Sequence, residues 1–237
     1  MHRRLRVSIL SALVAFACCF TGPQVGGAQT TRNGAIVLQV DASHVVQGVV
    51  RVYETVPVSG GPLTLVYPKW IPGTHGPNGP IANLGGLTIR ANGATLPWTR
   101  DLVDLYAFHV GVPAGTSALD VSFAYLAATA GGSRLAGPNI MSLNWNEVVL
   151  TPQADDYSKV VLVPSLRLPS AAWKYATALD TVSANGAVLT FAPVSLEMLV
   201  DSPLDAGLNT RTFELGTFNG APVTLAAFAD TQEQLAA

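Results

Sequence analysis

Hydrophobic and polar residues alternate with a period of two along most of the chain. Residues 36–41 (IVLQVD) and 118–125 (ALDVSFAY) place an apolar side chain at every second position, which is typical of strands with one buried face. Tyr106, Phe108 and Val110 follow the same spacing. The run Val49–Val56 is rich in β-branched residues, and we expect it to form a long strand at the centre of a sheet.

Asn-Gly dipeptides separate several of these runs. Both residues of such a pair tolerate a positive φ angle, which the tight turns of β-hairpins require. The sequence therefore predicts three hairpins: Leu87–Arg90 returning through Ala94–Trp98, Thr181–Ala184 returning through Ala187–Phe191, and Phe213–Thr217 returning through Pro222–Phe228.

The predicted fold class is all-β, an antiparallel β-sandwich with short helical turns over residues 29–202. Such turns are expected at Ser170–Trp173 and Thr231–Ala237, and Gly131–Asn139 is expected to be a mobile glycine-rich loop. After residue 202 a single hairpin remains, and a lone hairpin is only marginally stable in water. We therefore expect residues 203–237 to begin a further domain, and residues 208–237 to dock weakly on the sandwich or extend from it.

Residues 1–28 have the layout of a secretory signal peptide. Three arginines within residues 3–6 form a basic segment, residues 7–20 are apolar, and residues 26–28 are small. We expect cleavage after Ala28 and a periplasmic or secreted protein, with no membrane span in the mature chain. A lipoprotein signal is disfavoured, because the position three residues before Cys18 or Cys19 is not leucine.

Composition and charge limit the classes of partner. Removal of 28 residues from a chain of 237 leaves 209 residues without cysteine, so a buried core rather than disulfides must hold the domain together. Three of the 13 basic residues lie in the signal, and the remaining 10 against 15 acidic residues give a net charge of −5. Such a surface disfavours nucleic acid and anionic membranes as partners.

The stretch Tyr67–Pro80 departs from the alternating pattern. It holds four prolines and three glycines in 14 positions, and neither a helix nor a central strand tolerates this density, since proline lacks an N–H donor and fixes φ. The stretch is therefore predicted to be an ordered loop, a kind of segment that often carries function. We expect it to fold back on the domain with Trp70 as its anchor.

The histidines offer no local metal motif. After the signal the chain holds only His44, His75 and His109, and no His-Glu-x-x-His pair occurs. His75 lies in the Tyr67–Pro80 loop, where it would act as a ligand or proton carrier, or bond to the backbone as an ordinary loop histidine. Trp70 and His75 are the candidate substrate or interface residues of this loop.

Other candidate residues have ordinary structural interpretations. The aspartate pairs 101/104, 155/156 and 201/205 have the chemistry of acid and base partners or calcium ligands, but turn formation is the more frequent role of such residues. Ser133 lacks the Gly-x-Ser-x-Gly setting of a serine nucleophile.

Four tryptophans allow an alternative function. Trp70, Trp98, Trp145 and Trp173 would form a stacking platform for sugars in a secreted carbohydrate-binding module. Anchoring of the core or of loops is the default role of tryptophan. A protein-binding β-sandwich is a further alternative, for which the sequence offers no specific patch.

Several segments, in order, resemble the N-terminal region of the glycyl aminopeptidase family, whose members are zinc metallopeptidases with a thermolysin-like catalytic domain that is often followed by a PDZ domain. The likeness covers nearly the whole mature chain. The matching stretches are Tyr67–Pro80, Asn144–Asn146, Val163–Pro169 leading to Trp173 and Ala176–Leu179, and Pro193–Pro203.

The resemblance implies an N-terminal β-rich domain that precedes the catalytic one. The hairpin after Pro203 resembles the opening sheet of that catalytic domain, and the zinc-binding His-Glu-x-x-His helix would lie beyond residue 237. No catalytic or metal residue of the family is therefore assigned here, and this chain alone is expected to be inactive, as a fragment or, less favoured, a truncated product. The implied partners are a catalytic domain, in the same or an adjacent polypeptide, and a peptide substrate.

Overall fold

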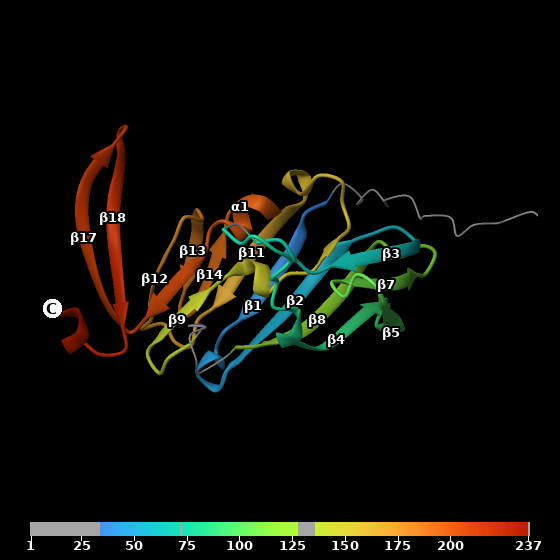
Figure 1. The fold of residues 1–237 in the computed structure, drawn as a ribbon, viewed down its shortest axis with the longest axis horizontal. Helices are drawn as coiled ribbons and strands as arrows, with labels where there is room; N and C mark the ends of the chain where they lie inside the picture. Colours follow the sequence, from blue (N-terminus) through green and yellow to red (C-terminus); the bar gives the residue numbers. More distant parts are fainter. Residues whose placement is uncertain (1–33, 72, 128–135, 237) are drawn as a thin grey trace, which may run out of the picture.

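The computed structural model describes residues 34–71, 73–127 and 136–236. The predicted signal peptide lies outside these residues, as does the 131–135 part of the loop predicted to be mobile. The described residues form antiparallel-rich sheets with few helices, which confirms the predicted all-β sandwich (Figure 1).

The largest sheet has nine strands. The predicted central strand is confirmed, because β2 pairs with β1 on one side and with β8 on the other. One neighbouring pair, β1 and β11, is parallel. In spatial order the strands are β13 (Thr181–Asn185), β14 (Val188–Phe191), β11 (Val161–Arg167), β1 (Ile36–Asp41), β2 (Val49–Pro57), β8 (Ala118–Leu126), β4 (Leu84–Ala91) and β5 (Ala94–Leu96), with β15 (Val194–Ser195) beside β11.

Two smaller sheets complete the body of the domain, and a separate two-stranded sheet follows them in the chain. The four-stranded sheet has the order β10 (Thr151–Pro152), β3 (Gly61–Val66), β7 (Ala107–Val112) and β6 (Trp98–Arg100). The three-stranded sheet has the order β12 (Lys174–Thr177), β16 (Leu204–Gly207) and β9 (Ile140–Leu143). The two-stranded sheet consists of β17 (Asn209–Phe218) and β18 (Ala221–Ala229).

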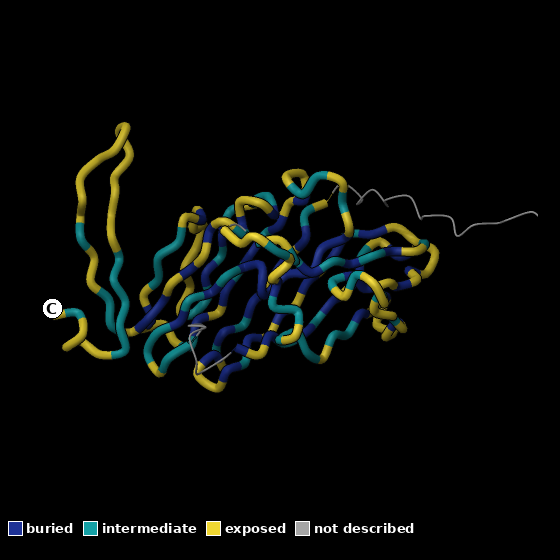
Figure 2. The backbone as a smooth tube through the Cα atoms, in the orientation of Figure 1, coloured by how far each residue is buried: buried dark blue, intermediate teal, exposed yellow. Residues whose placement is uncertain are grey.

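One continuous core joins the three sheets of the body. Leu38 and Val52 come from the nine-stranded sheet, Leu65 from the four-stranded sheet and Leu143 from the three-stranded one, and all are buried in the same cluster. The alternation of the sequence explains this arrangement, since every second side chain of β1 and β8 points inward. Figure 2 shows the buried backbone running through the middle of the body.

Helical structure is short, as predicted. Of the two predicted helical turns, that at Thr231–Ala237 is confirmed by a 3₁₀ turn at Glu233–Leu235, whereas Ser170–Trp173 forms a hydrogen-bonded turn and no helix. The single α-helix among the described residues is α1 (Leu196–Val200). Five 3₁₀ turns are η1 (Val45–Gln47), η2 (Ile81–Asn83), η3 (Trp145–Glu147), η4 (Tyr157–Lys159) and η5 (Glu233–Leu235). No helix in the described part of the chain has the length and hydrophobicity that crossing a bilayer requires.

All three predicted hairpins are confirmed. They pair β4 with β5, β13 with β14, and β17 with β18. Asn92 and Asn219 adopt positive φ angles of 50°, followed by Gly93 at 81° and Gly220 at 82°. These angles match the type I′ turns that Asn-Gly pairs favour.

The β17–β18 hairpin extends away from the body (Figure 1), as one of the two expected arrangements. Val223 and Leu225 are exposed, while Phe228 near its base is half-buried. Asp230 holds the base in place, because its backbone oxygen accepts hydrogen bonds from the side chains of Asn139 and Asn209, both at 2.8 Å. Residues 204–207 pair with β9 and β12 inside the body, and the extended hairpin begins at Asn209.

The contrast between body and hairpin predicts two different mutational costs. Phe191 is 1% exposed and its ring packs edge-on against Trp145 at 5.9 Å, whereas Phe218 on the hairpin is 71% exposed. Phe191→Ala should cost about 3–5 kcal/mol of unfolding free energy in urea denaturation. Phe218→Ala should change it by less than about 0.5 kcal/mol. Equal losses would show that the hairpin packs on the body in solution.

Candidate functional site

The described residues of the Tyr67–Pro80 stretch, 67–71 and 73–80, form the predicted loop, but its anchor is Tyr67 and not Trp70. Tyr67 is 1% exposed, and its hydroxyl donates a hydrogen bond of 3.0 Å to the backbone oxygen of Glu147. Trp70 is 62% exposed. The expectation of a buried Trp70 is therefore wrong, because Tyr67 is the last inward residue of the β3 alternation and already supplies the aromatic contact with the core.

Further bonds brace the loop. Its two ends approach closely, since the N–H of Gly79 donates to the backbone oxygen of Lys69 at 3.0 Å. A Cβ atom at Gly79 would lie 2.0 Å from the backbone oxygen of Pro68, so only glycine fits there. The hydroxyl of Tyr106 donates to the backbone oxygens of Pro77 and Gly79, at 2.7 and 3.0 Å.

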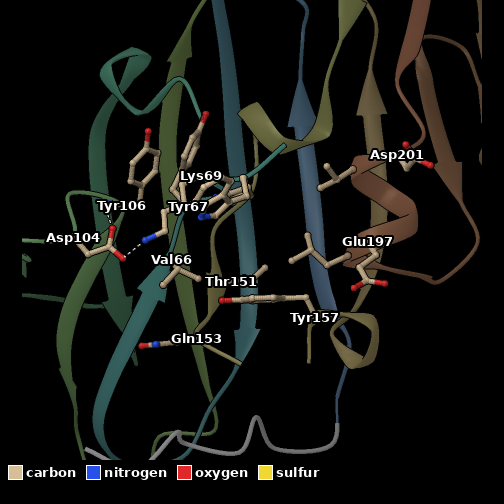
Figure 3. Close-up of a pocket in the computed structure, with 14 residues that line it drawn as sticks. Val66, Tyr67, Lys69, Asp104, Tyr106, Thr151, Gln153, Tyr157, Glu197 and Asp201 are labelled. Atoms are coloured by element: carbon tan, nitrogen blue, oxygen red, sulfur yellow. Dashed lines mark hydrogen bonds and ion pairs between the residues drawn. The ribbon is translucent and has the colours of Figure 1, made fainter. Parts of the chain in front are cut away.

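A pocket lies between this loop and helix α1. Its volume is about 700 Å³, within the range of about 300–1,000 Å³ typical of ligand sites. Figure 3 shows Tyr67, Lys69 and Tyr106 on one side and the helix that carries Glu197 and Asp201 on the other. Lys69 pairs with Asp104 at 2.7 Å, which ties the loop to the turn before β7.

Helix α1 forms the opposite wall because of its local sequence. The hydroxyl of Ser195 caps it by accepting the N–H of Met198 at 3.2 Å. Leu196 and Leu199 are buried, and Val200 lines the pocket. This helix was not predicted from the sequence, although a serine before two leucines three positions apart is a signal for it.

The two candidate residues have different positions. Trp70 lines the pocket. His75 is exposed in the same loop and is not among the residues that line the pocket. The structure therefore brings Trp70, and not His75, next to the cavity.

Asp101, Asp156 and His109 have structural roles. Asp101 accepts the backbone N–H groups of Val103 and Asp104, both at 2.8 Å, and its other oxygen lies 2.9 Å from Nε2 of His109. The hydrogen bond with His109, followed by the backbone bonds, lowers the pKa of Asp101 to about 2. Asp156 caps η4 through Ser158 and pairs with Lys159 at 2.8 Å.

The tryptophans do not form a sugar platform. Trp145 and Trp173 are buried in the core, and Trp98 is half-buried with its indole N–H donating to the backbone oxygen of Leu87. Only Trp70 among the four is largely exposed. A carbohydrate-binding module is therefore not favoured, because three of the four tryptophan side chains pack within the domain.

A metal site does not emerge from the residues that the structure describes. No group of three or more histidine, cysteine, aspartate or glutamate side chains among them is arranged to hold a metal ion. The resemblance places the zinc ligands beyond residue 237, so no chemical step is assigned to zinc in this chain.

Two buried carboxyl groups lie behind the pocket. Glu54 on β2 is buried, and one of its oxygens accepts the N–H of Leu150 at 2.8 Å while the other has no hydrogen-bond partner. Burial raises the pKa of Glu54 to about 8, and burial likewise raises the pKa of Glu147 to about 7. The Glu54 bond fixes the segment whose next residue, Thr151, lines the pocket.

The fold is similar to that of a solved structure. An aminopeptidase N family protein from Idiomarina loihiensis matches with a TM-score of 0.64 and 18% identity, over 85% of this chain and 34% of that chain. Aminopeptidase A from Legionella pneumophila matches at 0.46 and 10%, over 81% and 23%, and an M1 zinc metallopeptidase from Deinococcus radiodurans at 0.38 and 13%, over 81% and 45%. Only the first TM-score exceeds 0.5, and at this identity it supports the fold alone.

The class of domain follows from these observations: it is a β-sandwich domain of the kind found in the Idiomarina aminopeptidase N family protein. The chain belongs to the peptidase M61 N-terminal domain family, which matches residues 37–208. No curated protein is a significant match. The chain spans about a third of the length of the Idiomarina protein, as the 34% coverage shows.

The buried Glu54 predicts a stability that falls as the pH rises. Its folded pKa of about 8 lies above the ordinary value of 4.5, so between these values the folded state keeps a proton that the unfolded state has lost. Stability is therefore greatest below pH 4.5 with respect to this group and is lost as the pH rises through about 8. Glu147 contributes in the same direction, up to about pH 7.

Glu54→Gln should flatten this pH dependence. Glutamine retains the oxygen that accepts the Leu150 N–H but cannot ionise. Urea denaturation at pH 5 and pH 9 should show a loss on the order of 1–4 kcal/mol in the natural protein that is smaller in the variant. Parallel stability curves for the two proteins would contradict the assignment.

Proposed function

We propose that this chain is the non-catalytic N-terminal domain of an exported zinc metalloaminopeptidase of the glycyl aminopeptidase type, and that it walls one side of the active-site cleft. The observation that carries the proposal is the braced Tyr67–Pro80 loop, which holds Trp70 exposed at a pocket in a chain of the peptidase M61 N-terminal domain family.

The exposed Trp70 supports a contact role. Tryptophan is enriched among the residues that dominate binding interfaces, where it fills pockets and excludes water. Here the loop is fixed at both ends by the Tyr67 and Gly79 bonds, so little conformational entropy would be lost on contact. The proposed contacts are the catalytic domain, in the same or an adjacent polypeptide, and the peptide that enters the cleft. His75 would extend this surface from the same loop.

The zinc is assigned to the catalytic domain. The chemistry that it supplies in such enzymes is activation of a water molecule for attack on a peptide bond. No residue of the present chain is given a role in that step. We propose that the domain limits access to small N-terminal residues of the substrate.

We also propose that the protein is exported, on the basis of its first 28 residues. Their basic, apolar and small-residue segments support export through a cleaved signal peptide, to the periplasm or the exterior. The catalytic domain would then work in the same compartment.

Alanine substitutions in the loop test the proposal. In the peptidase polypeptide that carries this domain, Trp70→Ala should lower kcat/KM for peptides by about five- to thirtyfold, the effect of losing one interface tryptophan. His75→Ala should have a smaller effect in the same direction.

Two controls give these measurements their meaning. Both substituted side chains are exposed. The free energy of unfolding of each variant, measured by thermal denaturation, should therefore stay within about 0.5 kcal/mol of that of the natural protein. Tyr53→Ala changes an exposed aromatic residue on the nine-stranded sheet and should leave the kinetics unchanged. Natural kinetics for both loop variants would remove the proposed role.

A further inference from the structure

The pocket beside α1 combines aromatic walls with an excess of negative charge. Trp70, Tyr106 and Tyr157 line it with accessible rings, together with the aliphatic Val200, while Tyr67 and Leu196 lie buried behind them. A cavity of about 700 Å³ has room for a large side chain and the backbone that flanks it. The lining therefore favours a ligand with an aromatic ring.

Both walls are held in place without a ligand. Tyr67 is fixed by its bond to the backbone oxygen of Glu147, and Tyr106 by its two bonds to the loop. Helix α1 is fixed by its Ser195 cap and by the burial of Leu199. Preorganised walls reduce the entropy lost on binding.

The charges at the rim favour a cation. Lys69 and Asp104 neutralise each other in an ion pair of 2.7 Å. Glu197 on α1 and Asp201, which directly follows α1, are the other charged residues that line the pocket, and both are exposed. Two carboxylates beside aromatic faces attract a positive group and repel an anion.

The floor contains a polar atom whose bonding capacity is unused. Thr151 lines the pocket and is buried, and among the described residues its hydroxyl has no hydrogen-bond partner. Buried hydroxyl groups usually have a partner. That oxygen has almost no accessible surface, so an occupant would contact the aromatic walls and the rim carboxylates instead.

We propose that this pocket binds an aromatic side chain of a peptide next to a positively charged side chain, away from the small N-terminal residue that the proposed function admits. The inference rests on the proposed function in that the ligand is a peptide. It adds the chemical class of the group that the domain recognises. It also makes α1, which lies more than 100 residues after the Tyr67–Pro80 loop in the chain, part of the recognition surface.

Small probes test the proposal on this chain alone. Phenylalaninamide carries a ring and a cation, N-acetylphenylalanine a ring and an anion, and alaninamide a cation without a ring. Ligand-observed NMR and the fluorescence of the exposed Trp70 should show saturable binding of phenylalaninamide. Alaninamide should bind at least about tenfold more weakly, since it buries no ring. N-acetylphenylalanine should bind about three- to tenfold more weakly because of the rim carboxylates.

Variants of α1 locate the binding. Val200→Trp should fill the cavity and abolish binding of phenylalaninamide. Met198→Trp adds the same side chain at an exposed position of the same helix that does not line the pocket, and should leave binding unchanged. The double change Glu197→Gln with Asp201→Asn should remove most of the preference for phenylalaninamide over N-acetylphenylalanine. It also decides the question if Val200→Trp fails to fold.

Several results would overturn the proposal. They are the absence of saturable binding, equal binding of the three probes, unchanged binding in the folded Val200→Trp variant, or an unchanged charge preference in the double variant. These outcomes are separate from a failure of the proposed function, which is measured by peptide kinetics in a polypeptide with the catalytic domain.

Discussion

The bond from the Tyr67 hydroxyl to the backbone oxygen of Glu147 is the constraint on which the candidate site depends. It joins residues 80 positions apart and is buried. Through it the end of β3, where the Tyr67–Pro80 loop begins, is fixed to η3 and the core. Burial raises the pKa of the phenol, with Tyr125 and Glu147 adding to the rise, so Tyr67 remains a neutral donor at physiological pH. A charged or mobile Tyr67 would leave the loop without its internal support.

The rest of the loop follows from this fixed end. Once Tyr67 is buried, Lys69 can reach Asp104 and the Gly79 N–H can close the neck of the loop. The Tyr106 hydroxyl then lies within hydrogen-bonding distance of the backbone oxygens of Pro77 and Gly79. Prolines cannot donate backbone hydrogen bonds, so the loop depends on these few contacts for its order. The exposure of Trp70 is a consequence of this bracing, because the core contact is already made three residues earlier.

Local patterns predicted most of the fold. The alternation in residues 36–41 and the Asn-Gly turns specify strands and hairpins from neighbouring residues alone. The same alternation in β2 indicates that Glu54 points inward, because it lies an even number of positions from the buried Val50, Val52 and Val56. The site was harder to predict because it joins β3, the turn before β7, η4 and α1. Choosing Trp70 over Tyr67 as the anchor requires knowing where the inward alternation ends.

The stability of this domain and the contact role proposed for Trp70 depend on different residues. Trp145 and Phe191 stabilise the core through burial, and Glu54 is tolerated there because one oxygen is bonded and the group remains protonated near neutral pH. The bonds that brace the loop are made by Tyr67, Lys69, Gly79 and Tyr106. The conformation of the loop therefore does not depend on Trp70. A residue such as Trp70 can then remain exposed without weakening the fold. This exposure is what the contact role proposed for Trp70 requires.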